Sequence, residues 1–241
     1  MNKRIASLGA LLFVGLAVGV SSLEARTLDR EKYLTVSEVE LYEVVDGRES
    51  FVERLPAPAP TEKPTEPKKD GGLGDIISIG EKIWQIIEAN RPVVTQNYSA
   101  VSALPVGATV WTDLDGWSEP TIKIFKLVYT NTYKMKVVEF EYRVAYTTGG
   151  TFKGVGQYLS RVEIEPKVLN VAWGYKFNAN GMVLSVTNAG TREAPLAAME
   201  LNLNWSVETV MRHMSQSVRY YIRGDGLFKS ISDGNMATGL K

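Results

Sequence analysis

Apolar and polar residues alternate with a period of two over much of the second half of the chain. The segment "KVVEFEYRVAYT" places Val138 and Phe140 on one side of an extended chain and Glu139 on the other. Segments 169–177, "LNVAWGYKF", and 199–207, "MELNLNWSV", follow the same rule. This period is typical of strands with one dry and one wet face, as in antiparallel sheets.

Glycine-containing turn signals separate these runs. They are Asp115-Gly116, "TTGG" at 147–150, Asn180-Gly181, "NAGT" at 188–191 and "GDG" at 224–226. The pattern predicts about eight strands, and therefore an antiparallel β-sandwich or a small barrel over residues 92–232, followed by a flexible tail at 233–241. Residues 206–217, "SVETVMRHMSQS", fit either a short helix or a strand interrupted by a bulge.

One segment before this region has a helical period. In "GDIISIGEKIWQIIEANRP", the side chains of Ile83, Trp84 and Ile87 fall on one half of a helical wheel and the charged residues on the other. We therefore expect an amphipathic helix over 73–91, ended by Pro92. Its "DIIS" and later Trp and Ile pair resemble staphylococcal delta-toxin peptides. The apolar face would cover either the protein's own sheet or a lipid surface.

The N-terminus has the pattern of an export signal. "MNKR" is basic, an apolar run follows, and the small residue Ala25 offers a cleavage site, so residues 1–25 are predicted to be a signal peptide. The alternative is an uncleaved anchor, because Ile5 to Leu23 is uncharged and barely long enough to span a bilayer. Either way we expect an exported protein, in the periplasm, at the cell surface or secreted.

Two segments lie between the signal and the helical pattern. Residues 26–54 contain two strand-like runs around Asp46-Gly47, which predicts a β-hairpin. Residues 55–72, "LPAPAPTEKPTEPKKDGG", hold five of the ten prolines and many charges, which predicts a stiff, solvated linker.

Composition excludes several chemistries. The 27 basic and 27 acidic residues give a net charge of zero, so nothing favours nucleic acid as a partner. The chain has no cysteine, which excludes disulfides and thiolate sites, and suits a bacterial envelope protein that folds without them. Its single histidine, His213, excludes a multi-histidine zinc site and would have to serve any Ser-His-Asp triad.

A few residues are candidates for specific chemistry. "DLDGWSE" offers Asp113, Asp115 and Glu119 as a calcium site, although the full EF-hand spacing is missing. Trp111 and Trp117 flank this turn and are candidates for an exposed binding platform.

Two other motifs have ordinary structural explanations. Glu163 and Glu165 share one side of a predicted strand, but a catalytic pair needs burial and usually comes from separate elements. The "RGD" at 223–225 could be an adhesion motif, and its Asp-Gly also makes a turn. No residue is assigned a catalytic role, and no cofactor is expected.

These patterns predict an exported, non-enzymatic envelope protein that binds or scaffolds through a β-sandwich domain. Its partner would be an envelope protein or a glycan. One alternative is a membrane-acting protein that inserts residues 74–91 into a lipid interface through Ile83, Trp84 and Ile87. Another is a hydrolase whose site has no recognisable motif.

Overall fold

The computed structural model of the chain describes residues 29–55, 76–80, 82–93, 100–232 and 235–236. The predicted signal peptide, all of the predicted linker except Leu55, and most of the predicted tail lie outside these residues.

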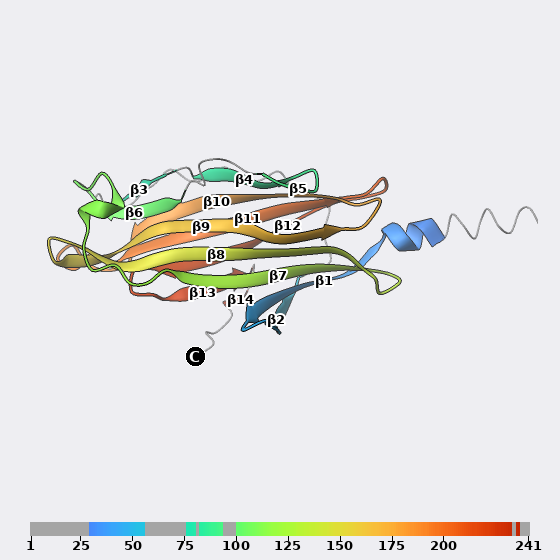
Figure 1. The fold of residues 1–241 in the computed structure, drawn as a ribbon, viewed down its shortest axis with the longest axis horizontal. Coiled ribbons are helices and arrows are strands. Elements are labelled where there is room, and N and C mark those ends of the chain that lie inside the picture. Colours follow the sequence, from blue (N-terminus) through green and yellow to red (C-terminus); the bar gives the residue numbers. More distant parts are fainter. Residues whose placement is uncertain (1–28, 56–75, 81, 94–99, 233–234, 237–241) are drawn as a thin grey trace, which may run out of the picture.

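Two seven-stranded antiparallel sheets face each other (Figure 1). The first sheet has the order β2 (Arg48–Arg54), β1 (Val36–Val45), β7 (Thr121–Asn131), β8 (Lys136–Phe152), β9 (Val155–Val171), β6 (Val101–Pro105) and β3 (Ile76–Ile79). The second has the order β14 (Asn235–Met236), β13 (Phe228–Ser232), β12 (His213–Arg223), β11 (Ala197–Glu208), β10 (Lys176–Asn188), β4 (Ile83–Glu88) and β5 (Arg91–Pro92). The predicted sandwich is confirmed, and it is not a closed barrel.

The core lies between the sheets and is rich in aromatic rings. Alternate residues of β8, including Phe140, are fully buried, as the period-two pattern predicts. Phe140 meets Phe177 of the second sheet at a ring distance of 5.1 Å, and Phe125 meets Tyr220 at 5.0 Å. Aromatic pairs add to the stabilisation from apolar burial, so these contacts join the two layers firmly.

The prediction of an amphipathic helix over 73–91 is wrong for its described residues. Residues 76–79 form β3 in the first sheet, and residues 83–88 form β4 in the second. Between them, Gly80 adopts a φ of +122°, and a side chain there would meet the Ala100 carbonyl oxygen at 2.7 Å. The stretch therefore passes from one sheet to the other at a bend that requires glycine.

Strand β4 also shows why the sequence resembled a helix. Trp84 and Ile87 are buried in the core, whereas Ile83 is exposed. The register with β10 shifts between Gln85 and Ile87, which is the mark of a bulge and lets both Ile86 and Ile87 face inward. A bulge breaks the period of two, and the resulting spacing of apolar residues imitates a helical one. Trp84 and Ile87 thus pack inside the protein itself, which agrees with the expectation that this segment covers the protein's own sheet and not a lipid surface.

Three predicted turn or strand boundaries are also wrong. The "TTGG" segment lies inside β8, and Asn180-Gly181 lies inside β10. Segment 169–177 is not one strand, because β9 ends at Val171 and β10 begins at Lys176, with a turn through Gly174 at a φ of +86°. Segment 206–217 consists of the end of β11, a turn at 209–212 and the start of β12.

The predicted hairpin around Asp46-Gly47 is confirmed as β1 and β2, and β1 pairs along its length with β7. The hairpin is thus an edge of the first sheet rather than a separate unit. Strand β2 lies at one edge of that sheet and β3 at the other. The proline-rich segment therefore connects two edges of one sheet.

Candidate functional site

The calcium candidates lie on the loop 106–120, and Asp113 already has hydrogen-bond donors. Its Oδ2 accepts from the backbone N–H of Thr109 at 2.8 Å, from that of Val110 at 3.1 Å and from the Thr109 hydroxyl at 3.1 Å. These bonds, the Thr109 backbone first, hold the pKa of Asp113 below its ordinary value. Asp115 pairs through its backbone with Thr151. Within the described residues, no three carboxylates or imidazoles gather closely enough to hold a metal ion.

The two tryptophans on this loop differ in their surroundings. Trp117 packs over Gly150, where an added Cβ would meet its ring at 2.4 Å, and its Nε1 donates to the Trp111 carbonyl oxygen at 3.1 Å. Trp117 is therefore mainly structural. Trp111 is exposed, so of the two tryptophans it is the one whose side chain a ligand could cover.

Two other motifs are accounted for by local ion pairs. Arg223 forms a two-pronged ion pair with Asp225 of its own turn, so the charges of the "RGD" motif face each other. Glu165 forms an ion pair with Arg143 across the β8–β9 ladder. Burial raises the pKa of the neighbouring Glu163 above its ordinary value, and the charge of Glu165 raises it further. Neither motif leaves a converging pair of groups for catalysis.

His213 lies between a hydroxyl and a carboxylate. Its Nε2 is 3.2 Å from Ser215 Oγ, and its Nδ1 is 3.4 Å from Glu208 Oε1. The order of atoms is that of a Ser-His-Glu triad, which the sequence could not reveal because the three residues follow no known motif. The imidazole is half exposed, and Glu208 is also 3.7 Å from Lys176 Nζ.

The turn 209–212, which joins Glu208 to His213, lies at one end of the sandwich, which we call the tip. The tip consists of helix 29–34 and the turns 132–135, 172–175 and 209–212 (Figure 1). Tyr33 in the helix donates to the Trp173 carbonyl oxygen at 3.0 Å, and Tyr133 donates to Asp29 at 2.7 Å. The helix is thus tied to two of the turns, 172–175 and 132–135.

Large apolar side chains point outward from all three turns of the tip. Trp173 is 79% exposed and Val210 is 74% exposed, the two highest values among the exposed large apolar residues. Met211, Met135 and Tyr133 are exposed beside them. Exposed apolar side chains that gather in one place typically mark an interaction surface. The alternating pattern of segment 169–177 assigns Trp173 to a buried strand face, so the sequence does not indicate its exposure.

Hydrogen bonds within the turn 209–212 hold the backbone that carries Val210 and Met211. The Thr209 hydroxyl accepts hydrogen bonds from the backbone N–H groups of Met211 at 3.2 Å and Arg212 at 3.0 Å. The Thr209 N–H donates to the Arg212 carbonyl oxygen at 2.8 Å. Binding through this turn would therefore lose little backbone entropy.

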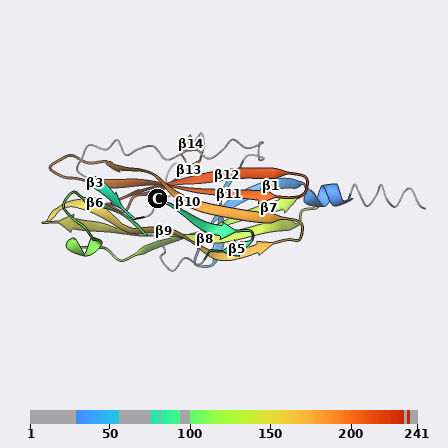
Figure 2. The ribbon, with the colours of Figure 1, turned by 90° about the horizontal axis from the view of Figure 1, so that it is seen from above.

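Charge differs between the two ends of the molecule. The helix and turns of the tip carry four basic residues, Arg30, Lys32, Lys134 and Arg212, and two acidic residues, Asp29 and Glu31. We call the opposite end the far end, and it consists of the loop 106–120 and the turns 153–154, 189–196 and 224–227. These segments carry two basic and five acidic residues. The two ends are distinct along the long axis in both views (Figures 1 and 2).

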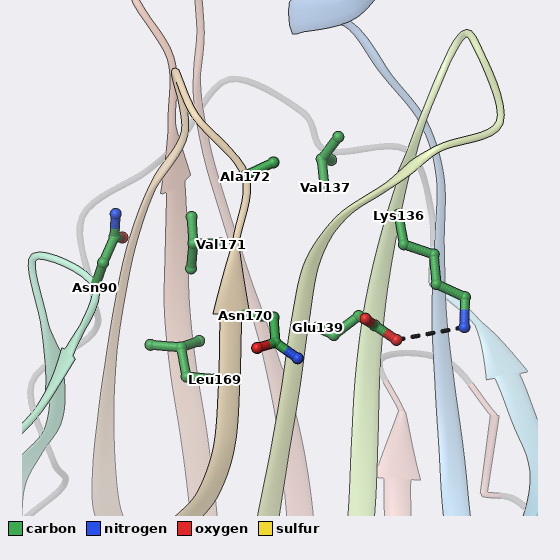
Figure 3. Close-up of a pocket in the computed structure, with 8 residues that line it drawn as sticks. All are labelled: Asn90, Lys136, Val137, Glu139, Leu169, Asn170, Val171 and Ala172. Atoms are coloured by element: carbon green, nitrogen blue, oxygen red, sulfur yellow. Dashed lines mark hydrogen bonds and ion pairs between the residues drawn. The ribbon is translucent and has the colours of Figure 1, made fainter.

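An open hollow of about 520 Å³ lies near the tip, where β8 and β9 approach the β4–β5 turn. It is lined by Asn90, Lys136, Val137, Glu139, Leu169, Asn170, Val171 and Ala172 (Figure 3). The Leu169 side chain extends toward Asn90, whereas Glu139 and Lys136 lie on the other side of β9 and pair with each other at 3.3 Å. The polar side chains that line the hollow do not point toward one common position, so they do not form a ligand-binding site.

None of the helices in the described part of the chain has the length and apolar character needed to cross a bilayer. Comparison of the chain with protein-family models, with curated proteins and with solved structures finds no match.

Proposed function

We propose that this chain is an exported, non-enzymatic module of the bacterial cell envelope that binds or scaffolds a partner through its tip. The observation that carries this proposal is the group of exposed apolar side chains on three separate turns, led by Trp173 and Val210. A surface of this kind is costly to leave in water, and hydrogen bonds hold its turns in place. The basic and apolar N-terminal sequence supports export.

The burial of Trp84 and Ile87 argues against insertion of residues 74–91 into lipid. Trp84 is only 9% exposed and its Nε1 donates to the Ile164 carbonyl oxygen at 3.3 Å, which ties β4 to the first sheet. Ile87 is fully buried. These side chains could reach a bilayer only if the core opened.

Export and binding are tested in one expression system. The full chain is produced in a bacterial host, the cells are fractionated and the N-terminus of the processed form is sequenced. A photo-crosslinking amino acid at position 173 should give envelope adducts, and the same group at position 155, which is exposed at the start of β9 near the far end, should give none. A chain that stays in the cytoplasm, or equal adducts at both positions, would contradict the proposal.

A second candidate function is ester or amide hydrolysis, and the Ser215–His213–Glu208 arrangement is the observation that favours it. We rank it second because the imidazole is half exposed and Ser215 lies within a strand, not at a turn that would supply oxyanion donors. A fluorophosphonate probe and a p-nitrophenyl ester test it. Labelling that Ser215→Ala and His213→Gln both abolish would establish hydrolysis, whereas unchanged labelling in either variant would exclude this site.

A further inference from the structure

We propose that the partner of the tip is an anionic lipid bilayer, with Trp173, Val210, Met211 and Met135 entering its interfacial layer. This inference rests on the proposed function, because it names the partner of the same surface. It places lipid contact on residues outside the stretch 74–91, whose Trp84, Ile86 and Ile87 side chains lie in the core.

The first support is the kind of side chain and its presentation. Trp173 is an amphipathic ring of the type enriched at membrane–water interfaces, and it stands at the outermost point of its turn with 79% of its surface exposed. Val210 and Met211 stand on a second turn and Met135 on a third. Apolar groups on separate turns, with polar backbone between them, suit insertion among headgroups better than contact with one flat protein face.

The second support is charge complementarity. Arg30, Lys32, Lys134 and Arg212 lie within the helix and turns, and all four are exposed. Of these four, Lys134 pairs with Glu38 in β1. The helix also exposes Asp29 and Glu31, so the helix and turns together carry a net charge of +2. Basic groups near an anionic bilayer are attracted to its surface. The acidic far end would be repelled, which orients the long axis toward the membrane.

The same charge argues against a second copy of the chain as the occupant. Two tips that met face to face would bring together eight basic and four acidic residues, twice the content of one tip. Like charges in contact oppose such a dimer. An anionic surface satisfies the apolar and the basic groups of the tip at once.

The third support is the position of the chain's start. The described chain begins with Asp29 at the tip, and residues 24–28 separate it from the uncharged run Ile5–Leu23. Five residues reach at most about 18 Å. Whenever the apolar run is held in a membrane, during export or as an anchor, the tip is the part of the sandwich brought close to the lipid.

The test uses vesicles and the chain from Arg26 onward, which retains every described residue and lacks the apolar run. Co-sedimentation is measured with phosphatidylcholine alone and with phosphatidylcholine mixed with phosphatidylglycerol. We expect binding to the mixed vesicles that weakens as NaCl is raised. The tip variant Trp173→Ser/Val210→Ser should bind about tenfold more weakly. The matched far-end variant Trp111→Ser/Val155→Ser should bind like the parent chain.

The outcomes separate the lipid inference from the proposed function. An absence of binding to the mixed vesicles, or an equal loss in both variants, overturns the inference. If position 173 still crosslinks to an envelope protein in that case, the proposed function stands with a protein partner. If sedimentation shows a dimer that Trp173→Ser disrupts, a second copy is the occupant and the inference is wrong. If neither lipid nor crosslink is found, both proposals fall.

Discussion

The hydroxyl groups of Tyr142 and Tyr220 meet at 2.6 Å in the interior of the sandwich, and one comes from each sheet. Both side chains are fully buried, and burial raises the pKa of each phenol well above its ordinary value. The bond satisfies two polar groups that would otherwise be costly to bury. It also fixes the relative position of β8 and β12.

Removing one hydroxyl of this pair should lower the free energy of unfolding by more than half as much as removing both. Tyr142→Phe leaves the Tyr220 hydroxyl buried without its partner, which we expect to reduce the free energy of unfolding by about 1–3 kcal/mol. The double variant Tyr142→Phe/Tyr220→Phe should be less destabilised than the sum of the single variants. Urea unfolding measures all three, with the exposed Tyr133→Phe as a control of small effect. Additive losses would show that the hydroxyls do not act as a pair.

Gly181 should tolerate no side chain because the Trp84 ring lies directly over it. An added Cβ would meet Trp84 Cε2 at 2.6 Å. We expect Gly181→Ala to destabilise the protein by about 1–3 kcal/mol through overpacking. In a Trp84→Val background the ring is gone, and the additional effect of Gly181→Ala should be much smaller. Thermal unfolding of the four proteins checks this, and an equal effect in both backgrounds would refute it.

The carboxyl of Glu163 should weaken the fold at neutral pH. Its pKa is raised in the folded state above the ordinary 4.5, first by burial and then by the charge of Glu165. The stabilisation that comes from its protonated form is therefore complete below pH 4.5 and is lost as the pH rises through the folded pKa. Glu163→Gln should raise the melting temperature by about 1–2 °C at pH 7, after allowance for solvent screening, and leave it unchanged at pH 4.

Glu165→Gln is the matched control for this experiment. It removes the ion pair with Arg143, so the variant should gain nothing at pH 7. A Glu163→Gln variant that melts lower than the parent at pH 7 would contradict the assignment.

Asp113 should stabilise its loop without a metal. Its pKa is lowered, so its stabilising effect is present above the ordinary 3.8 and is lost as the pH falls through the folded pKa. Asp113→Ala should lower the melting temperature at pH 7, and the difference from the parent should shrink in acid. Asp115→Ala should have little effect. Adding CaCl₂ or a chelator should change none of these temperatures, and a calcium-dependent rise lost in Asp113→Ala would restore the metal hypothesis.

Much of the sandwich could be predicted because its longest strands obey a simple rule. Val138, Phe140 and Tyr142 alternate with charged residues in β8, and all three are buried as the pattern requires. A strand that covers a core on one face only must show this period, so the sequence carries the information locally. The hairpin at Asp46-Gly47 could be predicted for the same reason, because the turn residues themselves carry the signal.

The errors arose where a distant side chain determines what a residue does. Gly150 and Gly181 resemble turn glycines, but each lies inside a strand and makes room for a tryptophan, Trp117 and Trp84 respectively. No feature of the neighbouring sequence indicates that ring. The tip was missed for a related reason, because Trp173 continues an alternating pattern while Gly174 turns the chain.

The proline-rich segment, predicted to be a linker, connects β2 to β3, and both strands belong to the same sheet. Its ends are fixed on opposite edges of a seven-stranded sheet, a separation of about 29 Å at the usual strand spacing. The segment therefore starts and finishes on the same folded body. A protease that cuts it would divide the polypeptide into two fragments, and the β1–β7 ladder should keep the smaller one attached to the larger.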